Sequence, residues 1–163
     1  MKLIRDSISD DLYQKCFDEI KKKRFENCWK SSSINWIDEI KKGIIGSCII
    51  TPVSDIIHDL LEEKLNSVLP EYRELVCQYY IWQPQSGISW HKDSGRIFGA
   101  TLYLNDLWHP DSGGWFIWKD GREHHTILPE KKLLVINDQN QYHCVTPVSS
   151  SMFRCTIQLW GNY

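Results

Sequence analysis

The sequence predicts a mainly β fold of the α+β class: a sandwich, jelly roll or barrel, with helices from the N-terminal part packed on one outer face. Short apolar and aromatic runs separated by turn residues fill the chain from Leu75 onward, which is typical of antiparallel β architectures. Helical periodicity is confined to about the first 70 residues. Eight Trp and seven Tyr, residue types that favour strands, fall mostly after Tyr72.

The length of 163 residues is enough for one domain and too short for two ordinary ones. We therefore expect one domain over residues 1–163, with residues 1–70 as helical support and residues 71–163 as the β core that holds any site. A net charge of −2 gives no general attraction to nucleic acid or membrane. This makes a nucleic-acid partner unfavoured, although a local basic patch would not be visible in the sum.

The chain has no apolar run near the roughly 20 residues of a membrane span, so no membrane association is expected. Its charged first residues, 1–11, are not followed by the apolar stretch of a signal peptide. None of the six cysteines forms a CxxC pair. The sequence therefore predicts reduced thiols and a cytoplasmic location.

Three helices are expected in the first part. Residues 9–24 carry Leu12, Cys16 and Ile20 at four-residue spacing, with Ser7 or Ser9 as a possible cap. Residues 35–42 suggest a shorter helix. Residues 51–68 suggest a longer one, with Thr51 as cap, Pro52 at the first helical position, and a buried stripe of Ile56, Ile57, Leu60, Leu61, Leu65 and Val68.

Seven short strands follow in the second part. Turn sequences such as Pro110-Asp111-Ser112-Gly113 and Asn137-Asp138-Gln139-Asn140 separate them. The predicted strands are residues 75–82, 97–104, 114–118, 124–127, 133–136, 143–145 and 153–160.

The segment Ser89-Trp90-His91-Lys92-Asp93 can supply two metal ligands. If it is a strand, His91 and Asp93 point to the same face. Two histidines and one carboxylate on one face of a metal ion leave three positions open, which is the arrangement of non-haem Fe(II) oxygenases. A pair of this kind often occurs by chance, so the interpretation needs a further ligand and a reason for the open positions.

The C-terminal part offers polar residues with separate roles. His143 begins one predicted strand, and Arg154, Thr156 and Gln158 share one face of the last. An arginine that points into a barrel is costly without a partner, and a dicarboxylate ligand would provide one in a bidentate pair. Tyr103 could donate a hydrogen bond to the same carboxylate.

The motifs taken in order resemble the 2-oxoglutarate/Fe(II)-dependent dioxygenases, and within them the prolyl hydroxylase branch. They run over about residues 75–163: Trp90-His91-Lys92-Asp93, Tyr103-Leu104-Asn105, Gly113-Gly114-Trp115-Phe116, His143-Cys144-Val145, Arg154 and Trp160. The resemblance implies a double-stranded β-helix, and Fe(II) and O₂ at His91, Asp93 and His143. It implies that Arg154 and Tyr103 hold the far carboxylate of 2-oxoglutarate, with Thr156 assisting and Trp82 near the co-substrate.

The activity implied is hydroxylation of a C–H bond, with a prolyl residue of a peptide or protein as substrate, giving succinate and CO₂. The alternatives are an AlkB-type nucleic-acid demethylase, a hydroxylase of a free amino acid or other small molecule, and a metal-binding β-barrel without turnover. Trp115 departs from the smaller residue common after Gly-Gly. The loops 106–113 and 137–142 are expected to decide the substrate, and whether they close over the site is open.

Overall fold

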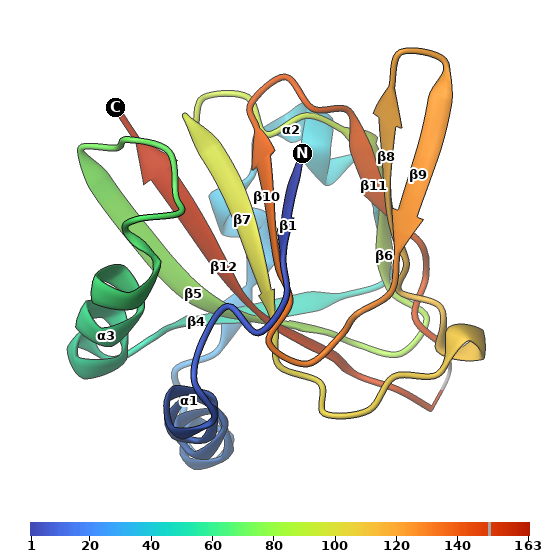
Figure 1. The fold of residues 1–163 in the computed structure, drawn as a ribbon. Coiled ribbons are helices and arrows are strands. Elements are labelled where there is room, and N and C mark those ends of the chain that lie inside the picture. The colour runs from blue at the N-terminus through green and yellow to red at the C-terminus, as the bar shows by residue number, and fades with distance from the viewer. Residues whose placement is uncertain (150) are drawn as a thin grey trace.

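The computed structural model describes residues 1–149 and 151–163, and two antiparallel sheets dominate it (Figure 1). The larger sheet has the strand order β1-β10-β7-β12-β5-β4-β2 and the smaller one β3-β6-β11-β8-β9. The predicted mainly β class is therefore confirmed. Alternation of strands between two facing sheets makes this fold a double-stranded β-helix.

The larger sheet is built around three long central strands: β5 (Glu74–Trp82), β12 (Arg154–Asn162) and β7 (Phe98–Tyr103). Its other strands are β1 (Lys2–Ile4), β2 (Lys30–Ser31), β4 (Cys48–Pro52) and β10 (Leu134–Asp138). The smaller sheet consists of β3 (Ile44–Ile45), β6 (Gly87–His91), β8 (Phe116–Asp120), β9 (Glu123–Ile127) and β11 (His143–Val145).

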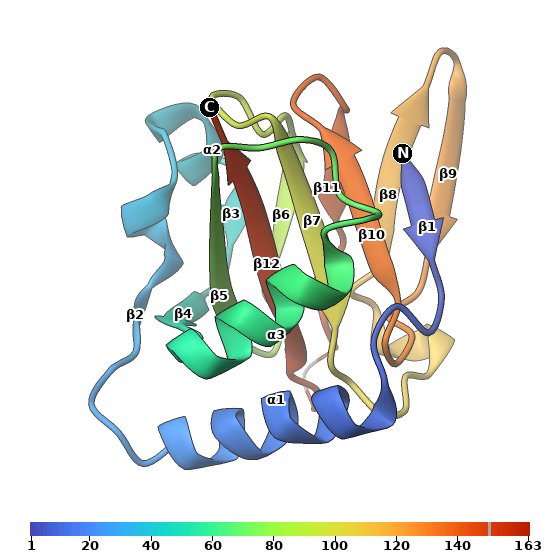
Figure 2. The ribbon, with the colours of Figure 1, turned by 60° about the vertical axis from the view of Figure 1, so that its left-hand side comes forward.

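Two helices, α1 (Asp10–Lys23) and α3 (Asp55–Leu65), cover the outer face of the larger sheet (Figure 2). Alternation along β12 explains why both faces of this sheet are occupied. Ile157 and Leu159 pack with the helices in one buried cluster, whereas Arg154 and Thr156 point between the sheets and are also buried. The second apolar cluster fills the space between the sheets and includes Tyr80, Trp82, Ile88, Tyr103, Phe116, Val135 and Val145.

The first helix matches its prediction closely, since α1 begins after Ser9, whose hydroxyl accepts from the Leu12 amide at 3.2 Å. The helix predicted over residues 51–68 begins later than expected. Thr51 and Pro52 end strand β4, which pairs with β5, and Ser54 caps α3 instead. The Thr-Pro pair has the residue types of a helix start, but pairing with a distant strand outweighs this local preference.

The helix predicted over residues 35–42 is also divided. A 3₁₀ turn, η1 (Ser32–Asn35), and a short helix, α2 (Asp38–Lys41), flank Trp36. The first 70 residues contribute more than helices, because β1, β3 and β4 pair with strands of the core. These strands have two to five residues, too few for a reliable alternating pattern. Over the described residues, no helix has the length and apolar character needed to cross a bilayer.

Candidate metal and co-substrate site

Two histidines lie side by side between the sheets. His91 ends β6 and His143 begins β11, and the two are register partners with ring centroids 4.3 Å apart. Each ring places Nδ1 near a backbone carbonyl two residues earlier, at 2.8 Å from Ser89 O and 2.9 Å from Gln141 O. With Nδ1–H donating to these carbonyls, each Nε2 keeps its lone pair for a metal.

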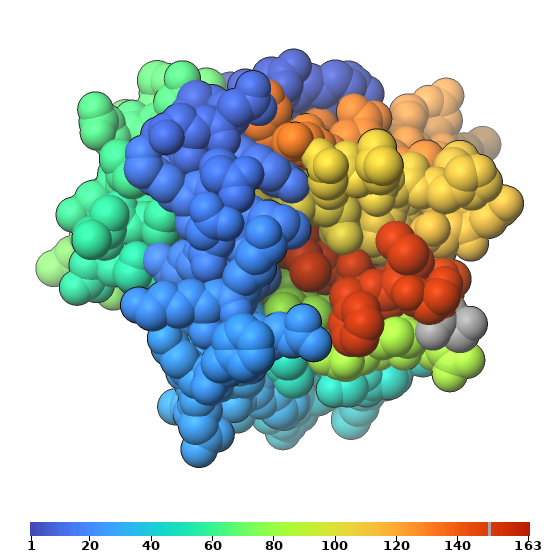
Figure 3. All heavy atoms as spheres, turned by 90° about the horizontal axis from the view of Figure 1, so that it is seen from below, coloured from blue at the N-terminus to red at the C-terminus, as the bar shows by residue number. Residues whose placement is uncertain are grey.

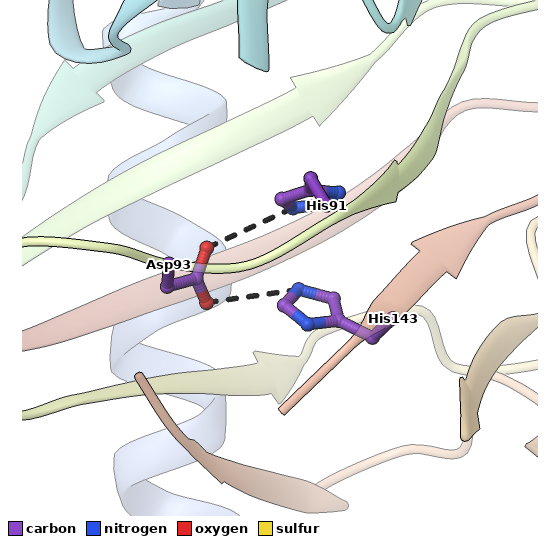
Figure 4. Close-up of side chains that lie close together, drawn as sticks. All are labelled: His91, Asp93 and His143. Carbon is purple, nitrogen blue, oxygen red and sulfur yellow. Dashed lines mark ion pairs between the residues drawn. The ribbon is translucent and has the colours of Figure 1, made fainter. Parts of the chain in front are cut away.

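Asp93 supplies the third group, facing both Nε2 atoms (Figure 4). Its carboxylate oxygens lie 3.7 Å from His91 Nε2 and 3.6 Å from His143 Nε2. The three side chains offer ligand atoms that all lie within 4.8 Å of one another. Because metal–ligand bonds measure about 2.0–2.2 Å, atoms bound to one ion lie within roughly 4.4 Å of each other. The three side chains therefore need only a small movement toward one another to bind one ion together.

The prediction that Asp93 shares a strand with His91 is wrong, because β6 ends at His91 and Asp93 lies in the loop that follows it. Contacts with the larger sheet hold the carboxylate instead. Asn137 on β10 donates its Nδ2–H to Asp93 Oδ2 at 2.7 Å. Gly99 on β7 leaves the space, since a Cβ there would lie 2.7 Å from the same oxygen.

The charge state of His91 suits metal binding. Burial, and secondly the neighbouring His143, hold the pKa of His91 well below its ordinary value, against the opposing effect of Asp93. His91 is therefore neutral near pH 7, and only a neutral imidazole offers a lone pair.

Arg154 lies at the start of β12 opposite Trp82 and is only 2% exposed. Its NH2 donates to the Tyr103 hydroxyl at 3.0 Å, while its Nε has no hydrogen-bond partner among the described residues. No described carboxylate forms an ion pair with it, and Thr156 Oγ1 is also buried without a partner. A buried guanidinium beside an unpaired hydroxyl is unfavourable unless an anion binds there. The donor set therefore fits a carboxylate ligand.

A cavity connects the metal-ligand set with Arg154. His91, Asp93, His143, Trp82 and Arg154 all line it. Tyr103 and Thr156 are 0% and 1% exposed and do not line it, but they occupy paired positions on β7 and β12. The structure thus gathers all seven residues singled out from the sequence into one region.

Two residues of this region were not foreseen. Trp36 lines the cavity and stacks on Trp82 with ring centroids 5.9 Å apart, although its segment carries no motif. Asn137 was assigned to a turn because Asn137-Asp138 has turn residue types, yet it belongs to β10. Its position after an apolar run was a usable signal, since a polar residue that ends a buried strand often faces a site.

Trp108 of the loop 106–113 and the stem of Arg154 both lie close to Gly114. The Trp108 indole donates to Gly113 O at 2.9 Å. At Gly114, where φ is +64°, a Cβ would lie 3.0 Å from the Trp108 ring and 3.3 Å from Arg154 Cδ. Only glycine combines this backbone conformation with so little space. Gly114 therefore lets Trp108 and the stem of Arg154 both approach the backbone closely.

Two facing sheets that enclose two histidines and one carboxylate make this a β-helix protein whose enclosed side chains fit a non-haem metal ion. The chain belongs to the 2OG-Fe(II) oxygenase superfamily, because the model of that family matches residues 75–162. Its cofactors are accordingly Fe(II) and the co-substrates 2-oxoglutarate and O₂, as the resemblance implied. The matched segment contains His91, Asp93, His143 and Arg154.

Solved structures share the fold. A Pseudomonas putida prolyl-4-hydroxylase aligns with TM-score 0.77 and 18% identity over 99% of this chain and 91% of its own. A Trichoplax adhaerens prolyl hydroxylase, in complex with a peptide fragment of hypoxia inducible factor, aligns with TM-score 0.75 and 17% identity over 99% and 82%. HygX from Streptomyces hygroscopicus, with nickel, 2-oxoglutarate and hygromycin B bound, aligns with TM-score 0.69 and 10% identity over 98% and 82%. No curated protein matches the chain.

Proposed function

We propose that His91, Asp93 and His143 hold Fe(II), and that the chain hydroxylates a C–H bond while converting 2-oxoglutarate to succinate and CO₂. The observation that carries the proposal is the buried, incompletely partnered Arg154 in the cavity lined by those three residues. Arg154 binds the far carboxylate of 2-oxoglutarate, which removes the cost of a lone buried cation. The metal, when bound, supplies the oxidative chemistry.

The protein's own residues orient the co-substrate. The Tyr103 hydroxyl accepts from Arg154 and so directs its own proton toward the carboxylate. Thr156 Oγ1, unpartnered and 1% exposed, provides a further donor. Trp82 and Trp36 form a stacked apolar wall of the cavity, which excludes water from this end.

For the substrate we propose a prolyl residue in a peptide or protein. Support comes from the fold shared with the two prolyl hydroxylases, one of them bound to a peptide. Mass spectrometry of proline-containing peptides incubated with enzyme, Fe(II) and 2-oxoglutarate tests this choice. A gain of one oxygen on proline is expected. Oxidation of a methylated oligonucleotide or a free amino acid, with no reaction on peptides, would overturn it.

The role of Arg154 is tested by anaerobic titration of 2-oxoglutarate into protein loaded with Mn(II) in place of Fe(II). Removing one partner of a buried charge pair costs about 2–5 kcal/mol, so Arg154→Leu should weaken binding by at least about 30-fold. Arg154→Lys should lose less of the affinity for 2-oxoglutarate, because lysine keeps the positive charge although it lacks the bidentate geometry of arginine. Arg122→Leu, at an exposed turn, is the control and should bind as the wild type does.

Two further measurements separate the possible outcomes. The melting temperature of each variant shows whether lost binding reflects lost folding. If the folded wild-type protein binds Mn(II) but not 2-oxoglutarate, the proposed function is wrong. If Arg154→Leu binds 2-oxoglutarate normally, the anion lies elsewhere in the cavity.

A further inference from the structure

A groove on the outer face of the larger sheet lies away from the metal-ligand set. Figure 3 shows the hollow between the blue surface of α1 with the segment after it and the red surface of the C-terminal part of the chain. It encloses about 430 Å³, which is within the range of ligand-binding pockets. The groove lies where α1 ends and leaves the sheet beneath it uncovered.

The floor of the groove is one apolar row across three strands. Ile49 on β4 pairs with Ile81 on β5, and Ile81 pairs with Cys155 on β12. All three line the groove and are only partly buried. The preceding register row, Cys48–Trp82–Arg154, is buried on the other side of the same strands. A ligand in the groove would therefore be one sheet thickness away from Arg154 and would leave the cavity open.

The walls are aromatic. Phe153 lines the groove with 49% of its surface exposed. Trp29 forms another wall, held by its indole N–H, which donates to Lys23 O at 2.8 Å. A partly exposed apolar floor beside aromatic walls is suited to receive the apolar side chains of a partner protein.

The rim is basic, which restricts the partner. Residues 21–30 contain five Lys or Arg and one Glu, whereas the whole chain has a net charge of −2. Lys21 and Arg24 line the groove itself. Lys21 has Asp18 at 3.7 Å, but Arg24 has no ion-pair partner among the residues that the structure describes. Apolar floor and basic rim together are complementary to a segment that combines apolar and acidic side chains.

We propose that this groove docks an acidic, apolar segment of a partner protein. Its apolar side chains rest on Ile49 and Ile81 beside Phe153, and its carboxylates meet Lys21 and Arg24. The site is independent of the proposed function, because none of its residues lines the cavity of the metal-ligand set.

The test uses a fluorescein-labelled peptide, Glu-Leu-Asp-Phe-Glu-Leu-Asp-Leu, and fluorescence anisotropy with metal-free protein. The matched peptide Gln-Leu-Asn-Phe-Gln-Leu-Asn-Leu keeps the apolar side chains and removes the charges. Saturable binding of the acidic peptide is expected, at least about tenfold tighter than that of the neutral one, and weaker at high salt. Because it is measured without metal, the result does not depend on catalysis.

Three variants locate the binding. Arg24→Glu and Phe153→Ala should each weaken the acidic peptide about tenfold, as expected for central contacts of an interface. Lys42→Glu reverses an exposed charge outside the groove and should change affinity less than about twofold. Melting temperatures equal to the wild type's would show that folding is intact, since both groove side chains are exposed.

Several outcomes would overturn the proposal. Absence of saturable binding of the acidic peptide, or equal binding of both peptides, rules out charge-complementary docking. If Lys42→Glu weakens binding of the acidic peptide as much as Arg24→Glu does, binding depends on the overall charge of the protein and not on the groove. A dimer in sedimentation velocity that Phe153→Ala dissociates would instead assign the groove to a second copy of this chain.

Discussion

At the scale of single residues, each candidate metal ligand is oriented by a second group. Backbone carbonyls of Ser89 and Gln141 fix the two imidazoles, and the Asn137 amide fixes the Asp93 carboxylate. Such contacts determine which atom faces the metal. Asn137 is the only side chain among these three, so it is the one that substitution can remove.

Asn137→Ala should weaken Mn(II) binding by about 10- to 100-fold, the usual effect of losing an outer hydrogen bond to a metal ligand. Titration followed by electron paramagnetic resonance measures the affinity. Asn140→Ala is the control, because that exposed side chain lies in the neighbouring loop. An unchanged affinity in Asn137→Ala would mean that Asp93 is held without this bond.

At the scale of elements, the junction between β4 and α3 shows how pairing overrides a local signal. Thr51-Pro52 has the residue types of a helix start, but the pairing Thr51↔Tyr79 keeps it in the sheet. The Ser54 hydroxyl accepts from the Ile57 amide at 3.4 Å, and its own amide donates to Glu19 of α1 at 2.8 Å. The cap of α3 thus also joins the two helices.

Ser54→Ala should lower the free energy of unfolding by about 0.5–2 kcal/mol, the usual cost of a lost cap. Thr51→Val should change it little or raise it, because the Thr51 hydroxyl is buried without a described partner and its removal relieves a desolvation cost. Urea denaturation of both variants measures the difference. If Thr51→Val lowered the free energy of unfolding more than Ser54→Ala does, Thr51 and not Ser54 would be the residue that stabilises this junction.

At the scale of the whole molecule, both apolar clusters contain buried thiols. Cys16 and Cys77 lie in the cluster under the helices and Cys48 in the cluster between the sheets. Burial raises the pKa of each of these thiols to about 12. They are packing groups, and their ionisation opposes folding of the protein.

Between pH 7 and about pH 8.5, the ordinary thiol pKa, the contribution of these thiols to the free energy of unfolding should therefore stay level. Above it the unfolded chain loses protons that the folded chain keeps, so stability falls as pH rises, until about pH 12. Urea midpoints at pH 7, 8, 9.5 and 10.5 measure the decline. The urea midpoint of Cys48→Ala should fall less steeply with pH than that of the wild type. A midpoint that is constant to pH 10.5 would contradict the assignment.

Much of this protein follows from its sequence because the signals are local. The two faces of β12 and the short strands from Leu75 onward follow from alternation, which depends only on neighbours in the chain. The residue types of His91, Asp93, His143 and Arg154 specify their possible chemistry wherever they lie. The order of these motifs carried the resemblance that implied the family and the β-helix fold, and both are confirmed.

Features that depend on residues far apart in the sequence were decided only by the tertiary structure. Asp93 lies beyond its strand and reaches its place through Asn137, 44 residues away. Trp36 reaches the cavity by stacking on Trp82 of β5. The pairing of β4 with β5 moves the start of α3 to a later residue than the local sequence predicts. The groove exists because α1 ends before it covers Ile49 and Ile81. Apart from the polar Asn137 after its apolar run, these features have no local pattern, because each arises from side chains that meet only when the chain has folded.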